Sequence, residues 1–301
     1  MKYLYVNQKP VAGPWGGGNA FILALHKHAP KFGWTVTDDV SAIKPGVPVL
    51  CTNLTGDAGG LSLTFLAGLR VQSLKNYGKD VPIILRCNEN DARKATNHVD
   101  SAWLSSFSLC SKVLFVSNWL QSYFKCYGSQ YGVLVNGVDT EIFKRVDRVR
   151  SVRPSVVAHH WSDNELKGYD VYKQLDELAR KKLIDFTYIG RIKGSLFFSK
   201  MIPPLSGAKL GEALANHDVY ISGSRFDPGP NHILEALACG LPVYVHRDGG
   251  GGVEFAGEDH AFSSQDEMIS MIMNPQQNQI KLFSWEDCVK NLIKEVEALQ
   301  C

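Results

Sequence analysis

Short apolar runs bounded by turn residues recur along the whole chain and predict buried strands. Four of them are "KYLYV", "VPVLCTNL", "SVVAHHW" and "DFTYIG", and amphipathic segments such as "YDVYKQLDELARKKL" lie between such runs. Buried strands that alternate with amphipathic helices are typical of a parallel sheet with helices on both faces. We therefore predict an α/β chain with two doubly wound, Rossmann-like domains that face a ligand cleft.

A charged stretch, "EIFKRVDRVRSVRPS" at 141–155, separates the two halves of this pattern. It lacks apolar periodicity and ends beside a proline, so it is the best candidate for a linker. The alternation of strands and helices restarts after it. We expect a first domain over residues 1–150, a second domain over 151–284, and a final amphipathic helix within 285–301.

The composition is that of an ordinary globular protein and excludes several classes. The 301 residues carry a formal net charge of +2 and are 45% hydrophobic, which argues against nucleic acid as the main partner. There is no apolar run of about 18 residues and no apolar signal-peptide core, so we expect no transmembrane segment and a cytoplasmic protein. The seven cysteines form no C-x-x-C pair, which favours reduced thiols over a disulfide frame or a zinc site.

One segment, "DPGPNHILEALACGLPVYV" from Asp227 to Val245, places two carboxylates across a predicted helix start. Pro230 suits the first helical position, and Gly240 suits the residue just after the last. These two residues predict a helix from about 230 to 239, and the apolar run that follows predicts a buried strand.

The polar face of this helix has the spacing of a nucleotide site. Asn231, His232 and Glu235 share that face, because residues three and four apart are neighbours on a helix. The free N–H groups at the helix start favour an anion, and Glu235 lies roughly 7 Å further along the axis. That separation suits a diphosphate and the ribose of the same nucleotide, since a carboxylate can accept two hydrogen bonds from a vicinal diol. The alternative is a solvated helix with an ordinary surface glutamate.

Two loops that follow predicted strands could also carry chemistry. The loop "GPWGGGN" would let the backbone approach a ligand, but it is not a G-x-G-x-x-G fingerprint, and a plain tight turn is the alternative. Lys167 precedes a predicted helix and could sit against a diphosphate as a point charge. His159 and His160 are adjacent in a strand and face opposite sides of it, so we expect no metal shared between them.

The run "RCNENDARKATNHVD" gathers charged groups after another strand, with Arg86, Asp91 and His98 among them. Loops at strand ends often carry function, but a solvated charged surface is the alternative. No nucleophile elbow, H-E-x-x-H or calcium-loop pattern occurs in the chain.

Taken together, the motifs resemble those of retaining glycosyltransferases with the GT-B fold, family 4 (glycosyl transferases group 1) in particular. "DPGPNHILEALACGLPV" is similar to the nucleotide-sugar motif of that family. "VSNWLQSYF", "VNGVDTEIF", "LKGYD" and the amino-terminal Gly-Gly loop match further family features in the right order, over nearly the whole chain. The first domain would then lie on the acceptor side, the second would bind the nucleotide sugar, and the final helix would cross back to the first.

The resemblance implies an enzyme that moves a sugar from a nucleoside-diphosphate donor, a UDP or GDP sugar, with retention at the anomeric carbon. The acceptor would be a glycan, a lipid or a small molecule, and contact with a membrane surface is left open. The resemblance implies neither a metal nor a cofactor beyond the donor itself. In family 4 the leaving phosphate can help to deprotonate the acceptor, so a dedicated protein base is not required; His98 and Asp91 are the candidates if one exists.

The resemblance also assigns roles to single residues. Glu235 would bind the ribose hydroxyls, and Lys167 would bind the diphosphate. Asp227 stands where the family has a longer glutamate beside the transferred sugar. The arginine that the family places five residues before the lysine is Ser162 here, and Arg191 is a candidate for the missing charge. The remaining donor-binding candidates are Gly16, Gly17, Gly229, Asn231 and His232.

Three other functions are alternatives to transfer. A nucleotide-sugar epimerase on the same fold would need no acceptor, so products formed from the donor alone separate it from a transferase. A binding module would hold a nucleotide sugar without turning it over, and the departures at Asp227 and Ser162 keep that reading open. A dinucleotide oxidoreductase is disfavoured because its fingerprint is absent.

Overall fold

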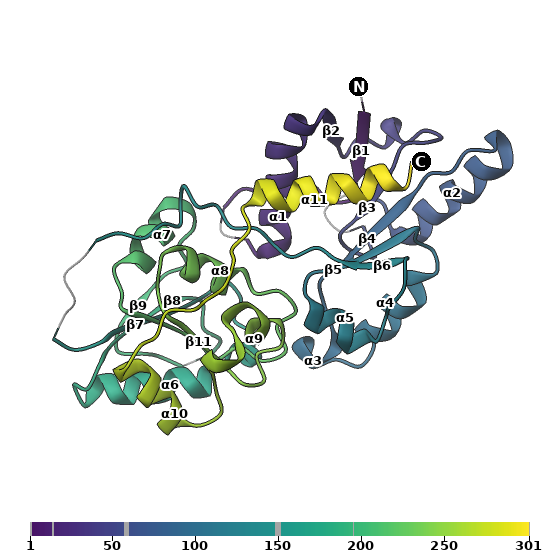
Figure 1. Cartoon of the computed structure of the whole chain (residues 1–301). Helices are drawn as coiled ribbons and strands as arrows, with labels where there is room; N and C mark the ends of the chain where they lie inside the picture. Colours follow the sequence, from purple (N-terminus) through teal and green to yellow (C-terminus); the bar gives the residue numbers. More distant parts are fainter. Residues whose placement is uncertain (1, 14, 57–59, 148–151, 195, 301) are drawn as a thin grey trace. The chain divides into compact units, whose positions relative to one another are not determined.

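The computed structural model describes residues 2–13, 15–56, 60–147, 152–194 and 196–300. The chain splits into two compact units, the first made of Met1–Ala12, Gly17–Gly137 and Trp285–Cys301, and the second of Gly13–Gly16 and Val138–Ser284. The domain boundary expected at residue 150 falls on residues 148–151, which lie outside the described part. Each unit is built around one sheet (Figure 1).

The first unit holds a six-stranded parallel sheet in the order β2-β1-β3-β4-β5-β6. Its strands are β1 (Lys2–Val6), β2 (Trp34–Thr37), β3 (Val49–Cys51), β4 (Ile83–Cys87), β5 (Lys112–Phe115) and β6 (Tyr131–Val133). Side chains alternate between its two faces, as the pleat requires. Leu4 and Val6 pack on one apolar core, and Tyr5 between them packs on the other.

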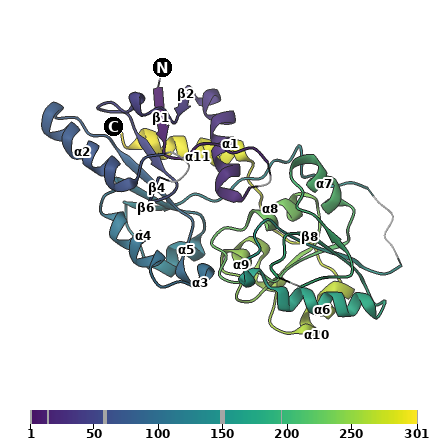
Figure 2. The ribbon, with the colours of Figure 1, turned by 180° about the vertical axis from the view of Figure 1, so that it is seen from behind.

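Helices cover both faces of this sheet (Figures 1 and 2). One face carries α1 (Gly17–His28) and α11 (Trp285–Ala298), and the other carries α2 (Leu63–Tyr77), α4 (Val99–Phe107) and α5 (Asn118–Phe124). The short α3 (Asp91–Lys94) follows β4. The last helix therefore completes the core of the unit in which the chain begins.

The second unit holds another six-stranded parallel sheet, in the order β12-β11-β10-β7-β8-β9. Its strands are β7 (Ser155–His160), β8 (Asp185–Gly190), β9 (Met201–Ile202), β10 (Val219–Ser222), β11 (Val243–His246) and β12 (Ala261–Phe262). Its helices are α6 (Tyr169–Arg180), α7 (Gly207–Ala215), α8 (Asn231–Ala238), α9 (Gly251–Ala256) and α10 (Gln265–Met273). In both views α6 and α10 lie on one side of the sheet, and α7 and α8 lie on the other (Figures 1 and 2).

The strand order places a topological switch point at β7. From β7 the chain moves outward to β8 and β9, and then returns to β10 on the other side of β7. Ligands of such sheets bind beyond the carboxyl ends of the strands at such a point. The two doubly wound parallel sheets confirm the predicted α/β fold class. Among the described residues, no helix combines the length and apolar character needed to span a bilayer.

Candidate active site

The helix that carries the two-carboxylate segment is α8, and it starts close to where the sequence predicts. It covers Asn231–Ala238, so it is one residue shorter at each end than expected. Pro230 is the cap residue with an extended backbone (φ −74°, ψ 105°) rather than the first helical residue. Its carbonyl accepts the first helical hydrogen bond, from the Ile233 N–H at 3.2 Å. Gly229 therefore lies in the loop before the helix, and Asn231 opens the first turn.

A tight backbone contact positions Lys167 at the carboxyl edge of the second sheet. Lys167 ends a single 3₁₀ turn, and Gly168 follows with φ +88°. A Cβ on Gly168 would lie 2.1 Å from the Gly223 carbonyl oxygen, so only glycine allows the two backbones to approach this closely. The Arg225 N–H also donates to the Leu166 carbonyl at 2.9 Å. The turn after β7 is thus packed against, and hydrogen-bonded to, the loop after β10.

The contact between these two loops brings Lys167 next to Asp227. The Lys167 Nζ donates to Asp227 Oδ2 at 2.7 Å, and both side chains are 8% exposed. The Asp227 backbone is held from the other side, because its carbonyl accepts from the Gly251 N–H at 2.8 Å. Gly250, with φ +67°, packs against Asp227 where a Cβ would meet its backbone at 2.9 Å. A buried charge pair therefore stands beside the start of α8.

Glu235 lies further along α8 and is held by a histidine from β7. The His159 Nε2 lies 2.9 Å from Glu235 Oε2, and the two side chains are 8% and 22% exposed. The motifs raised His159 only as a metal ligand and gave no sign of this contact with Glu235. The alternation of β7 was its one available signal, since it turns His159 toward the face that α8 covers and His160 toward α6.

His232 completes a buried cluster above the end of β7. Its ring lies 4.7 Å from that of His160, and the Tyr220 hydroxyl is 3.0 Å from His232 Nδ1. Burial lowers the pKa of His232 to about 4, although Asp227 nearby acts to raise it. Burial, with a smaller effect of His232, also holds the pKa of His160 well below its usual range. Both rings are therefore neutral at pH 7 and add no positive charge to the site.

The histidine cluster does not form a metal centre. No group of three or more His, Cys, Asp or Glu side chains within the described ranges is arranged to hold a metal ion. His160 instead pairs with the Tyr172 hydroxyl, which in turn accepts from the Gly223 N–H at 2.9 Å.

Arg191 follows β8 and lies flat against an aromatic ring. Its guanidinium carbon is 3.8 Å from the centre of the Trp161 ring. Its backbone carbonyl accepts from the Tyr188 hydroxyl at 2.9 Å and from the Tyr169 hydroxyl at 3.3 Å. A Cβ on Gly16 would lie 3.4 Å from Trp161, so Gly16 also sits beside this ring. The stack orients Arg191, whose role as a compensating cation stays a prediction.

The other predicted residues belong to the first unit. Gly17 opens α1, and His98 is the exposed cap residue of α4. Asp91 has a structural role, because it accepts from the Thr96 hydroxyl at 2.6 Å and from the Val99 N–H at 2.9 Å. Burial acts to raise the pKa of Asp91, but these hydrogen bonds outweigh it and lower the pKa. A carboxylate held in this way is a poor proton acceptor.

The solvated surface considered for the charged run after β4 does not apply to Arg86. This residue lies within β4 and is 1% exposed. Its guanidinium stacks over Phe21, with 4.2 Å between the guanidinium carbon and the ring centre, and donates to the Asn136 side chain. Burial lowers the pKa of Arg86 to about 10, so it remains a cation at neutral pH. Arg86 is buried because it lies on a central strand, although the residues that follow it in the sequence are polar.

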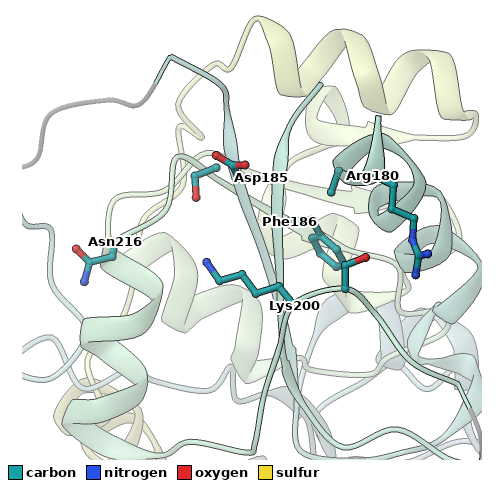
Figure 3. Close-up of a pocket in the computed structure, with 8 residues that line it drawn as sticks. Arg180, Asp185, Phe186, Lys200 and Asn216 are labelled. Atoms are coloured by element: carbon teal, nitrogen blue, oxygen red, sulfur yellow. The ribbon is translucent and has the colours of Figure 1, made fainter. Parts of the chain in front are cut away.

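A polar pocket of about 370 Å³ lies elsewhere in the second unit (Figure 3). It is lined by Ser155, Ala179, Arg180, Asp185, Phe186, Ser199, Lys200 and Asn216. Ser155 and Asp185 are the first residues of β7 and β8. The pocket is therefore at the amino ends of the strands, opposite the edge that carries Lys167 and Asp227, and we do not assign it to the candidate site.

Comparison with known proteins identifies the fold. No protein-family model matches the chain, and no curated protein matches it by sequence. Among solved structures, it is similar to a sucrose-phosphate synthase from Thermosynechococcus elongatus, with a TM-score of 0.71, 12% identity and 99% of each chain covered.

Two further solved structures are similar over nearly their whole length. AviGT4, a glycosyltransferase involved in avilamycin A biosynthesis, aligns with a TM-score of 0.62 and 11% identity, over 100% of this chain and 98% of its own. WaaG, a glycosyltransferase involved in lipopolysaccharide biosynthesis, aligns with a TM-score of 0.56 and 11% identity, over 99% and 98%. The chain therefore has the GT-B fold, as predicted, and at these identities the likeness establishes the fold alone.

Proposed function

We propose that this protein is a glycosyltransferase that moves a sugar from a nucleoside-diphosphate donor to an acceptor with retention at the anomeric carbon. The observation that carries the proposal is the Lys167–Asp227 pair, 2.7 Å apart and buried beside the start of α8. It lies at the carboxyl edge of a doubly wound sheet, where such folds bind nucleotides. The GT-B fold, which known glycosyltransferases share, supports this activity by analogy.

The proposed chemistry follows from where charge develops. Breaking the bond between the sugar and the phosphate places negative charge on the departing diphosphate. Lys167 and the free N–H groups at the start of α8 would stabilise that charge as it forms. Asp227, held against Lys167, would contact the transferred sugar, and the departing phosphate would take the acceptor proton.

The same ion pair favours one alternative, a module that binds a nucleotide sugar without turning it over. Asp227 already neutralises Lys167 at 2.7 Å, and Ser162 stands where the family has a second cation. A site with one neutralised cation would bind a diphosphate more weakly and would stabilise its developing charge less. Turnover separates the two readings, because both predict binding.

The experiment that tests the proposed function is a thermal-shift screen against UDP and GDP sugars, followed by product analysis. A ligand that binds only the folded state raises its stability by about 2.7 kcal/mol at a hundred times the dissociation constant. Release of the nucleoside diphosphate in the presence of an acceptor supports a transferase. Binding without release supports the module, and a product formed from the donor alone supports an epimerase.

We expect Glu235→Ala to weaken binding of the nucleotide sugar tenfold or more. A hydrogen bond to a charged group contributes about 1.5–3 kcal/mol, and the carboxylate can accept two from a ribose. The side chain is partly exposed on α8, so the fold should survive, which circular dichroism checks. Unchanged affinity in calorimetry, in a folded variant, would remove Glu235 from the site.

We expect activity to persist in excess EDTA. The described residues contain no group suited to a metal ion, and Lys167 with the α8 start would supply the positive charge. The measurement is the turnover rate before and after chelation, with magnesium and manganese added back in turn. Loss of turnover with EDTA and its recovery with either ion would show that the proposed electrostatics are incomplete.

A further inference from the structure

The contact between His159 and Glu235 is specific enough to carry a function of its own. The His159 Nε2 lies 2.9 Å from Glu235 Oε2. An ionised carboxylate can only accept hydrogen bonds, so the proton of this bond belongs to Nε2 of the imidazole. No hydrogen-bond partner for Nδ1 is found among the described residues. Among the described residues, the hydrogen bond to Glu235 is therefore the one that the His159 ring makes.

The His159 ring is held firmly where it stands. Its side chain is 8% exposed and packs edge-to-face against the rings of Tyr220 and His232, with centroids 5.5 Å and 5.9 Å away. The Tyr220 hydroxyl also contacts the His159 backbone, donating to its carbonyl at 3.2 Å. A ring fixed on this many sides fixes in turn the carboxylate oxygen that it holds.

The other oxygen of Glu235 remains open to a ligand. Among the described residues, Oε1 has no hydrogen-bond partner, and the side chain is 22% exposed. A free glutamate loses rotamer freedom when it binds, and that loss weakens binding. Anchoring at Oε2 removes much of this cost before the ligand arrives, and it leaves Oε1 to accept hydrogen bonds from a ligand.

We propose that His159 is a positioning residue that fixes Glu235 for the recognition of ribose hydroxyls, so that the site selects ribonucleoside diphosphates over their deoxy counterparts. This inference rests on the proposed function, since it requires a nucleotide at Glu235. The selectivity arises because a ligand without hydroxyls leaves the fixed carboxylate oxygen without a donor.

The test compares binding of UDP and GDP with binding of their 2′,3′-dideoxy counterparts by calorimetry. His159→Phe keeps the aromatic packing and removes the donor, and we expect it to weaken binding of the ribonucleotide about tenfold, the loss of one hydrogen bond to a charged group. Affinity for the dideoxy ligand should not change. His159→Gln, which restores an N–H, should recover part of the loss.

His160→Phe is the matched control. His160 is adjacent and also buried, and its ring pairs with the Tyr172 hydroxyl and lies 4.7 Å from that of His232, whereas the hydrogen bond to Glu235 comes from His159. We expect this variant to lower the melting temperature while leaving the ratio of ribo to dideoxy affinity unchanged. A purely structural effect of His159→Phe would instead lower both affinities together.

A double variant completes the experiment. In a Glu235→Ala background, His159→Phe should cause no further loss of ribonucleotide affinity, because the two residues act as one unit. If the wild-type protein binds nucleotides but His159→Phe leaves the affinity ratio unchanged, the inference is overturned and the proposed function stands. If the wild-type protein binds none of these ligands, the proposed function fails and the inference fails with it.

Discussion

Lys167→Met should lower the turnover rate at least about 100-fold, since each 1.36 kcal/mol of lost transition-state stabilisation is worth a factor of ten. Lys167 is the cation that lies against Asp227 at the start of α8. In a partly dry site, a charge beside a developing phosphate anion contributes several kcal/mol. Ser162 stands where the family 4 glycosyltransferases that the motifs resemble have a second cation, so little redundancy is expected. The measurement is the turnover number with saturating donor.

The fold of this variant needs its own control. Removing Lys167 leaves the buried Asp227 without its counter-ion, which costs about 3–5 kcal/mol of stability in comparable pairs. The double variant Lys167→Met/Asp227→Asn removes both charges and should regain the lost stability without regaining turnover. Lys167→Arg should restore only part of the rate, because a planar guanidinium does not replace a compact ammonium.

Comparing the Arg191→Ala variant with the Lys167→Met variant tests where the diphosphate binds. Arg191 is stacked on Trp161 beyond β8, so its loss should reduce turnover less than the loss of Lys167. If Arg191→Ala is severe while Lys167→Met is nearly neutral, the diphosphate lies against the loop after β8 and the proposed placement is wrong. If both are nearly neutral, the site does not catalyse transfer, and the binding module is favoured.

Asp227→Asn should reduce turnover about tenfold or more while leaving the affinity for the bare nucleoside diphosphate equal or higher. Asn keeps the shape of the side chain but releases Lys167 from its counter-ion, so the ammonium is freer to meet the diphosphate. An interaction with the reacting sugar affects rate more than nucleotide affinity. Losing one hydrogen bond to a charged group, about 1.5–3 kcal/mol, sets the scale of the fall in rate.

Calorimetry with the nucleoside diphosphate and a turnover assay check this prediction on the same protein. Equal losses in affinity and rate would place Asp227 on the nucleotide rather than on the sugar. A melting curve should accompany both measurements, because Lys167 in this variant is buried beside a neutral amide. Its stability should fall less than that of the Lys167→Met variant, since a flexible lysine can reach water more easily than a short aspartate.

Features that depend on near neighbours in the chain were determined by the sequence alone. The alternation of apolar runs with amphipathic segments predicts the two parallel sheets. A sheet that helices cover on both faces needs strands that are apolar throughout and helices that are apolar on one side. Pro230 and Gly240 bracket α8 to within one residue at its start, because proline fixes its own φ and glycine readily adopts the left-handed backbone (φ +75° at Gly240) that follows a helix end. The placement of Lys167 just before α6 follows from the same kind of local signal.

The pairs that make up the candidate site were decided only by the tertiary structure. Lys167 and Asp227 are 60 residues apart, and His159 and Glu235 are 76 apart. Both contacts need the parallel register of β7 beside β10, and the contact of Lys167 with Asp227 also needs the close approach of Gly168 to Gly223; neither is a local property. Arg86 shows the same limit, since its charge predicts exposure while its central strand buries it. Local periodicity determines which elements form, whereas the packing of distant elements determines which side chains meet.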